Sequence, residues 1–195
     1  LFSSHYLPTL ALPNVELITD AITEVTETGL RTDDGRVHDV DCIIWSTGFK
    51  VTDFVAPMRV IGAAGIELSD AWRDGAHAHL GMAVPGFPSL FLLYGPNTNT
   101  SGGSIIVYLE AQAAYIRQVL ERLRAGRHER VEVRPEVEAA SDRELQARFD
   151  GTAWTACDSW YRDEHGRIVA NWPGYMREYV ERTRSVDPDD CVFSP

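Results

Sequence analysis

The stretch LFLLYGPNTNTSGG, residues 90–103, decides the fold class of this chain. It begins with five consecutive apolar residues, a run typical of a strand that is buried on both faces of a parallel sheet. A glycine–proline pair ends the run, and a polar loop follows. Apolar residues then recur at three-, four- and seven-residue steps from Ile105 to Leu123, which predicts a helix that ends at Gly126. Strand, loop and helix in this order predict an α/β fold.

A second junction of the same form lies upstream, where the apolar run CIIW is followed by STGF at residues 42–49. The run belongs to a predicted strand over residues 37–45. The turn signal DDGR at residues 33–36 joins that strand to an alternating segment, residues 22–32. A short β-branched run predicts one more strand at residues 15–19.

Downstream of the long helix, the pattern predicts a strand at residues 131–133 and a helix at residues 142–149, capped by Ser141. Residues 159–161 and 167–170 flank a turn and are expected to pair as a hairpin. A final short helix is predicted at residues 176–184.

The composition limits the class of function. The chain has 195 residues, of which 44% are hydrophobic, so it holds enough apolar surface for one domain or for parts of two. A net charge of −11 argues against nucleic-acid binding, which needs a concentrated positive surface. No apolar run approaches the roughly 18 residues of a membrane span, and no secretory signal is visible. Three scattered cysteines support neither a disulfide framework nor a zinc site, which predicts a cytoplasmic location.

The two strand–loop junctions are the candidate ligand sites, because ligands collect beyond the carboxyl ends of parallel strands. The loop before the long helix offers backbone N–H groups at the positive end of the helix dipole, which suits an anion or an electron-rich carbonyl. On these grounds alone a simple helix cap is the favoured interpretation of the loop. His77 and His79 have no third ligand near them in sequence, so no metal site is predicted.

Four segments together resemble the flavin-containing and Baeyer–Villiger monooxygenases, which are class B flavin-dependent monooxygenases. DCIIWSTGF at residues 41–49 resembles their D-x-I-I-x-A-T-G-F/Y segment, although Ser46 stands where that family often has alanine. GMAVPGFPSLF at residues 81–91 resembles their G-M-x-V-P-G-F-P-N-L-F. Residues 95–112 resemble their G-P-N-T, G-S-I-I and E-x-Q stretch. CDSWY and NWPG, at residues 157–161 and 171–174, resemble their closing motifs.

The resemblance implies a carboxy-terminal portion of such a protein, with a partial Rossmann-like FAD- and NAD(P)-binding flavoprotein fold and a small α+β extension. Residues 1–40 would end the NADPH-binding domain, residues 41–130 would form the second part of the FAD-binding domain, and residues 131–195 would form the extension. Members of the family use NADPH and O2 to oxygenate a small ketone, amine or sulfide.

The resemblance also implies which residues meet the cofactor. The first two would lie near FAD where the chain crosses between domains, the next two would also bind the cofactor, and the last four would meet the pyrimidine edge of the flavin. In chain order these residues are Thr47, Gly48, Gly95, Pro96, Asn97, Thr98, Asn99 and Thr100. No general acid or base is assigned, so the catalytic residues stay unknown.

The family's two GxGxxG fingerprints, which hold the pyrophosphates of FAD and NADPH, do not occur in this sequence. We therefore expect that the chain depends on an amino-terminal part of its own protein, is inactive alone and self-associates. A non-catalytic binding module that retains the flavoprotein fold is the main alternative. A different flavoprotein, such as a relative of the disulfide reductases, is a third.

Overall fold

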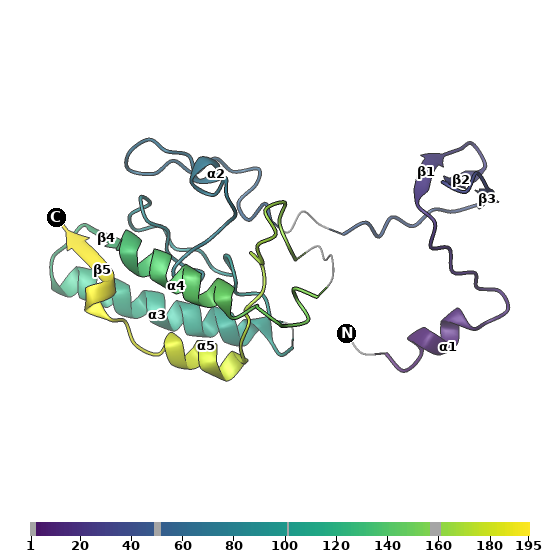
Figure 1. The fold of residues 1–195 in the computed structure, drawn as a ribbon. Coiled ribbons are helices and arrows are strands. Elements are labelled where there is room, and N and C mark those ends of the chain that lie inside the picture. Colours follow the sequence, from purple (N-terminus) through teal and green to yellow (C-terminus); the bar gives the residue numbers. More distant parts are fainter. Residues whose placement is uncertain (1–2, 49–51, 101, 157–160) are drawn as a thin grey trace. The chain divides into compact units, whose positions relative to one another are not determined.

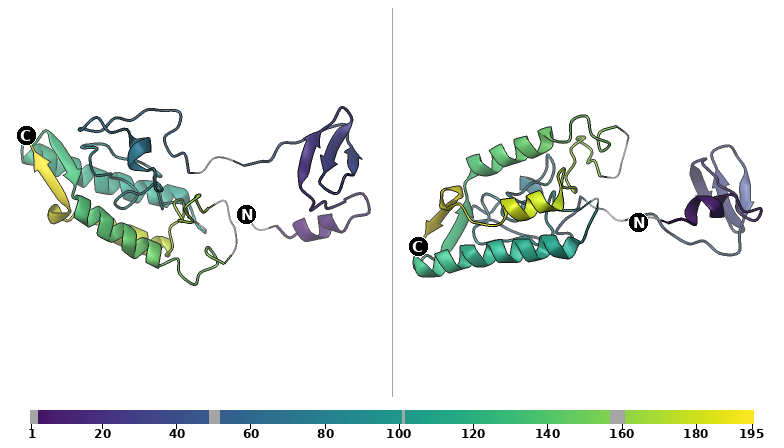
Figure 2. Two further views of the ribbon diagram at one scale, coloured as in Figure 1. Left: turned by 45° about the horizontal axis from the view of Figure 1, so that its top comes forward. Right: turned by 90° about the horizontal axis from the view of Figure 1, so that it is seen from below.

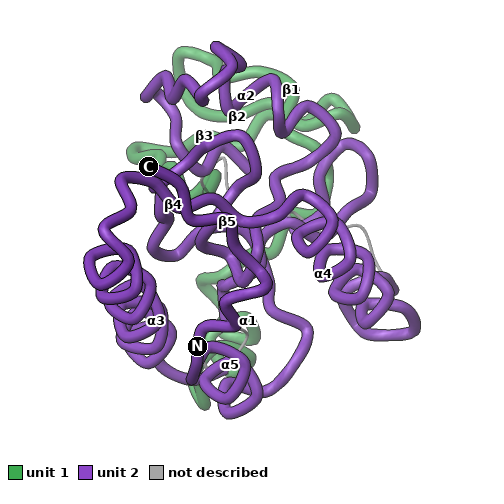
Figure 3. The backbone as a smooth tube through the Cα atoms, turned by 90° about the vertical axis from the view of Figure 1, so that its left-hand side faces the viewer, with its two compact units in different colours: residues 1–48 green, residues 49–195 purple. Residues whose placement is uncertain are grey.

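A computed structural model describes the chain in four segments: residues 3–48, 52–100, 102–156 and 161–195. The chain divides into two compact units, Leu1–Gly48 and Phe49–Pro195, which Figure 3 colours separately. Each unit is described by itself. The assignment of residue ranges to cofactor domains remains a prediction.

The first unit consists of one short helix and a small antiparallel sheet (Figure 1). The sheet has the order β1–β2–β3, and Leu30 pairs with His38 in its second ladder. No apolar residue in the described part of this unit is fully buried. The elements are α1 (Tyr6–Leu10), β1 (Ile22–Val25), β2 (Gly29–Thr32) and β3 (Val37–Asp39).

The turn between β2 and β3 confirms the hairpin predicted at residues 33–36. Gly35 adopts a left-handed φ of 85°, which glycine tolerates without steric cost. The carboxylate of Asp34 accepts hydrogen bonds from the Thr32 hydroxyl at 2.6 Å and from the Arg36 backbone N–H at 3.1 Å. These bonds lower the pKa of Asp34 and fix the turn.

One predicted strand of this unit is wrong, and the strand predicted at residues 37–45 is confirmed only at Val37–Asp39. Residues 15–19 form no strand, and beyond β3 the run that includes Ile44 and Trp45 is extended but unpaired. Ile44 is 84% exposed and Trp45 is 67% exposed. An apolar run becomes a buried strand only when other strands satisfy its backbone and other layers cover its side chains, and no described residue does either here.

The second unit holds three helices of seven residues or more and a two-stranded sheet (Figures 1 and 2). Helices α3 and α5 pack together, and the antiparallel pair β4–β5 lies at the carboxyl end of α3. The elements are α2 (Leu68–Ala71), α3 (Ile105–Ala125), β4 (Arg130–Val133), α4 (Pro135–Ala147), α5 (Met176–Arg182), the 3-10 turn η1 (Pro188–Asp190) and β5 (Cys191–Ser194).

Helix α3 confirms the helix predicted from Ile105, and it ends at Gly126 as expected. Its buried residues are spaced three or four apart and lie on one face: Tyr108, Gln112, Tyr115 and Val119. Tyr108 belongs to one core cluster of the described residues, and Tyr115 and Val119 belong to another. The remaining cluster surrounds Leu68 and Trp72. The α5 and β4 predictions are also confirmed.

Other predictions for the second unit need correction. Helix α4 begins at Pro135, so Ser141 lies inside it and caps nothing. Residues 90–94 form no strand. Leu92 donates instead to the Met82 carbonyl at 2.8 Å, and no described strand lies beside it to make a parallel sheet. The hairpin is present only as a bridge between Arg162 and Ile168, while residues 159 and 160 lie outside the described residues.

Candidate functional site

The polar bend at residues 95–100 pairs with a segment far away in the sequence. Asn97 N–H donates to the Val169 carbonyl at 2.8 Å, and Asn99 N–H donates to the Ala170 carbonyl at 2.9 Å. Trp172 N–H returns a bond to the Asn99 carbonyl at 2.9 Å, which completes a parallel bridge between Asn99 and Asn171. The bend and residues 169–172 therefore form one hydrogen-bonded unit.

Two of the predicted cofactor contacts have buried side chains that bond to backbone carbonyls of the protein. Asn97 is 6% exposed, and its amide donates to the carbonyls of Ile168 at 2.6 Å and Asn171 at 2.9 Å. Thr98 is fully buried, and its hydroxyl donates to the Gly95 carbonyl at 2.7 Å. These side chains are not available to a ligand.

Asn99 and Thr100 are half-buried and lie at the open side of the bend. The Asn99 side chain accepts a hydrogen bond from the Tyr94 hydroxyl at 2.8 Å and donates to the Asn171 side chain at 2.7 Å. Thr100 hydroxyl donates to the Gly102 carbonyl at 2.5 Å. Burial raises the pKa of Tyr94, which keeps its hydroxyl protonated and able to donate.

A hollow of about 460 Å³ opens beside Thr100. Its lining carries no acidic side chain, and its residues come from the bend and from the loop that leads into α5: Thr100, Gly102, Pro173, Gly174, Tyr175 and Met176. The first turn of α3 follows directly in sequence. That turn contains no acidic residue, and its N-cap Ser104 makes no side-chain hydrogen bond. The surroundings therefore favour an electron-rich or anionic group.

Gly95 and Pro96 are buried within the bend, where a side chain at position 95 would overlap the Gly81 carbonyl at 2.3 Å. Thr47 and Gly48 are exposed and end the first unit. Because the two units are not placed relative to each other, the predicted approach of Thr47 and Gly48 to the bend stays a prediction.

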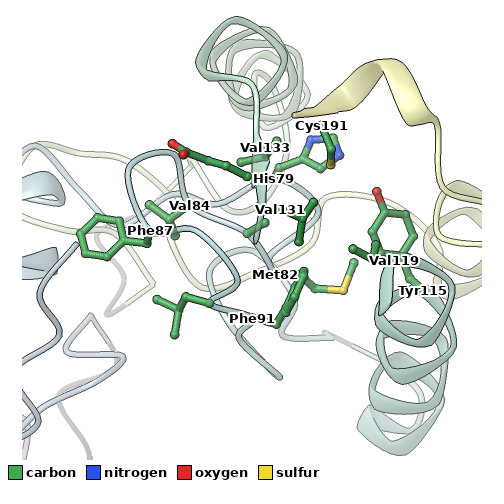
Figure 4. Close-up of a pocket in the computed structure, with 13 residues that line it drawn as sticks. His79, Met82, Val84, Phe87, Phe91, Tyr115, Val119, Val131, Val133 and Cys191 are labelled. Atoms are coloured by element: carbon green, nitrogen blue, oxygen red, sulfur yellow. The ribbon is translucent and has the colours of Figure 1, made fainter. Parts of the chain in front are cut away.

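His77 and His79 make contacts within the protein core. His77 Nδ1 lies 2.8 Å from Oε1 of the buried Glu138, and His79 lines a cavity of only about 10 Å³ (Figure 4). Among the described residues, no cluster of three or more histidine, cysteine, aspartate or glutamate side chains is arranged to hold a metal ion. Nor is any described helix long and apolar enough to cross a membrane.

Sequence reasoning missed the partner of the bend. Asn171 and Trp172 fall within a predicted closing motif, and in the structure they form the second strand of the bridge. Trp172 packs in the core. No local pattern signals a pairing between positions 72 residues apart.

Comparison with known proteins gives a consistent result, although no family model matches the chain. A Baeyer–Villiger monooxygenase of Streptomyces coelicolor is 36% identical over 190 residues, which cover 96% of this chain and 37% of that protein. An FAD-binding monooxygenase of Aspergillus niger is 35% identical over 99% of this chain and 33% of its own length. The chain thus spans little more than a third of these relatives.

Solved structures agree. A closed form of cyclohexanone monooxygenase superposes with a TM-score of 0.82 at 26% identity, covering 98% of this chain and 38% of that one. An oxidised steroid monooxygenase bound to NADP superposes with a TM-score of 0.79 at 26% identity, covering 98% and 37%. The mixed α/β fold predicted from the sequence is confirmed.

Proposed function

We propose, from the premise that this chain is homologous to a carboxy-terminal portion of Baeyer–Villiger and related FAD-binding monooxygenases, that its whole protein is an NADPH- and O2-dependent flavoprotein monooxygenase. The observation that carries the proposal is the match over 96% of the chain to a named Baeyer–Villiger enzyme. The substrate would be a small organic molecule, a ketone, amine or sulfide, and the location would be cytoplasmic.

The bend and the hollow are the proposed flavin contact. FAD would supply the redox chemistry, and this chain would supply the surface against the electron-rich edge of its ring. Backbone N–H groups at the start of α3 and the second amide hydrogen of Asn99 would offer hydrogen-bond donors there, and Thr100 would line the contact. The buried Asn97 and Thr98 would hold the shape of the bend.

The residues present fit such a group. The hollow lies within the size range of small-molecule sites, and its lining leaves no carboxylate facing a ring that becomes anionic on reduction. Gly102 contributes a wall without a side chain, so a flat ring can approach the backbone closely. Gly95, Pro96, Thr47 and Gly48 remain proposed contacts that act through the backbone or through local shape.

The test compares the whole protein that contains this chain with the isolated 195 residues. The whole protein should be yellow, oxidise NADPH faster when a cyclic ketone such as cyclohexanone or a sulfide is added, and yield a product heavier by one oxygen atom. The isolated chain should be colourless and leave NADPH unconsumed, because it holds no dinucleotide fingerprint.

Two outcomes would overturn the proposal. A whole protein that retains no FAD would favour the binding-module alternative, in which the fold persists without the chemistry. Tight yellow FAD in the isolated chain would contradict the expected dependence on an amino-terminal part.

A further inference from the structure

Trp172 lies between the bend and a group of ion-paired helix residues. Its ring is almost fully buried and packs edge-on against Tyr179, with ring centres 5.2 Å apart. Tyr179 in turn stacks on Tyr108, in the first turn of α3, at 4.5 Å. The indole therefore contacts, directly or through one ring, the helix that begins beside the hollow.

Trp172 forms hydrogen bonds on two sides of the hollow, one through its backbone and one through its indole. Its backbone N–H bonds to the Asn99 carbonyl in the bend, and its indole N–H donates to the Tyr175 carbonyl at 3.3 Å. Gly174 lies against the same ring, since a side-chain carbon built at that position would lie only 3.0 Å from the indole nitrogen. One residue thus connects the bend with the opposite wall.

Two arginines fix the ring from the helix side. The guanidinium carbons of Arg148 and Arg182 lie over the indole at 5.4 Å and 5.6 Å from its centre, within the range of cation–π attraction. Glu178 binds Arg148 through two bonds of 2.6 Å and 2.7 Å and also binds Arg182 at 3.2 Å. Arg182 reaches α4 through Glu144 at 2.5 Å.

We propose that Trp172 is a positioning residue for the flavin-contacting bend: it transmits the geometry of the ion-paired group formed by Glu144, Arg148, Glu178 and Arg182 to Asn99 and to the loop at residues 173–176. The proposal rests on the proposed function of the bend. It implies that the ion-paired group, whose side chains do not form the bend, affects how tightly the bend binds the flavin ring.

The experiment substitutes Trp172→Phe and, as a matched control, Trp72→Phe in the whole protein. Trp72 is also buried, and its indole also donates to one backbone carbonyl, that of His77 at 2.8 Å, but it lies in a different core cluster. Both changes remove one indole and one hydrogen bond. They differ in their connection to the bend.

Amide hydrogen exchange is the first measurement. Trp172→Phe should accelerate exchange in residues 95–103 and 169–176 at least tenfold, while Trp72→Phe should change the same residues less than twofold. Equal acceleration by both variants, or none by Trp172→Phe, would overturn the proposal, because the effect would then reflect general loss of stability.

FAD affinity and the flavin absorption spectrum are the second measurement. Trp172→Phe should raise the FAD dissociation constant about tenfold and displace the flavin absorption maximum, and Trp72→Phe should leave both near wild type. If Trp172→Phe accelerates amide exchange in the bend but changes neither the FAD dissociation constant nor the flavin spectrum, Trp172 has no role in cofactor binding. If the wild-type protein binds no FAD, the proposed function fails, whereas the exchange result still decides whether Trp172 positions the bend.

Gly174→Ala provides an independent variant. A methyl group there would approach Glu178 Oε2 to 2.3 Å and Arg148 Nη2 to 2.6 Å, so the ion-paired group must shift. We expect the same exchange response at residues 95–103 as for Trp172→Phe. Unchanged exchange in the bend would contradict the coupling.

Discussion

Asn97 shows how one side chain can be essential to a site without facing it. Its φ of 56° lies in the left-handed region, which asparagine tolerates better than most residues. Its amide donates to two carbonyls: that of Ile168, which also accepts from Gln146, and that of Asn171, to which no other described residue donates. The sequence motif includes Asn97, but the motif does not distinguish a predicted cofactor contact from a residue that shapes the bend.

Asn97→Ala should lower the free energy of unfolding by about 2–4 kcal/mol, because the Asn171 carbonyl loses its donor, the Ile168 carbonyl keeps only the bond from Gln146, and a left-handed alanine is strained. Chemical denaturation followed by circular dichroism measures the change. Asn97→Gly relieves the backbone strain but not the hydrogen-bond loss, so it should recover about 1 kcal/mol relative to alanine. A loss below about 0.5 kcal/mol for alanine would mean that the two bonds contribute little.

His77 and His79 are two residues apart but have opposite electrostatic surroundings. The hydrogen bond to Glu138 raises the pKa of His77 above its ordinary value of 6.5. Burial lowers the pKa of His79, although Asp190 at 3.7 Å and Glu138 oppose that effect. Neither ring nitrogen of His79 has a hydrogen-bond partner among the described residues, and the adjacent cavity holds at most about one water molecule.

Titration of the histidine ring protons by NMR should therefore give a midpoint above 6.5 for His77 and below 6.5 for His79. Below its ordinary pKa, the unfolded chain binds the proton that folded His79 resists, so the contribution of His79 to the free energy of unfolding should fall as the pH drops from 7 toward 5, whereas that of His77 should rise. His79→Gln should reduce that fall. A midpoint for His79 at or above 6.5 would contradict the effect of burial.

At the scale of elements, helix α3 and the turn before β3 were predictable because their signals are local. Apolar spacing specifies α3, and Asp-Gly chemistry specifies the turn. The sequence offers two start signals for α4, the N-cap residue type Ser141 and Pro135, which is favoured at the first position of a helix, and the structure uses Pro135. The strands predicted at residues 37–45 and 90–94 depend on neighbouring strands, which a local pattern does not reveal.

Ser141→Ala tests the corrected start of α4. Because Ser141 lies within the helix, alanine should leave the free energy of unfolding unchanged or raise it by up to about 0.5 kcal/mol. The control is Asp187→Ala, which removes a side chain that accepts from Asp189 N–H at 2.9 Å and should cost about 0.5–1 kcal/mol. A loss of about 1 kcal/mol for Ser141→Ala would instead support Ser141 as the N-cap of the helix.

At the scale of the whole molecule, the two units differ in how they are stabilised. The second unit has three core clusters, whereas the first has no fully buried apolar residue among those described. The run around Ile44 and Trp45 presents large apolar side chains to solvent. Surfaces of this kind mark places where another surface packs.

We expect the isolated chain to self-associate through this run. Ile44→Ser with Trp45→Ser should shift the mass measured by light scattering at high concentration toward the monomer. Ile106→Ser, at a 56%-exposed position in the second unit, is the control and should leave the mass unchanged. A wild-type chain that remains monomeric at high concentration would refute the expectation.

The bridge between Asn99 and Asn171 also bears on the order of events during synthesis. The two residues stand 72 positions apart, so the ribosome has released the bend, all of α3 and all of α4 before the partner segment emerges. Helix α3 can form early from local contacts, but the bend at its start acquires its shape only after residues 168–172 have been translated. A nascent chain would therefore complete the proposed flavin-contacting bend well after the helix that follows it.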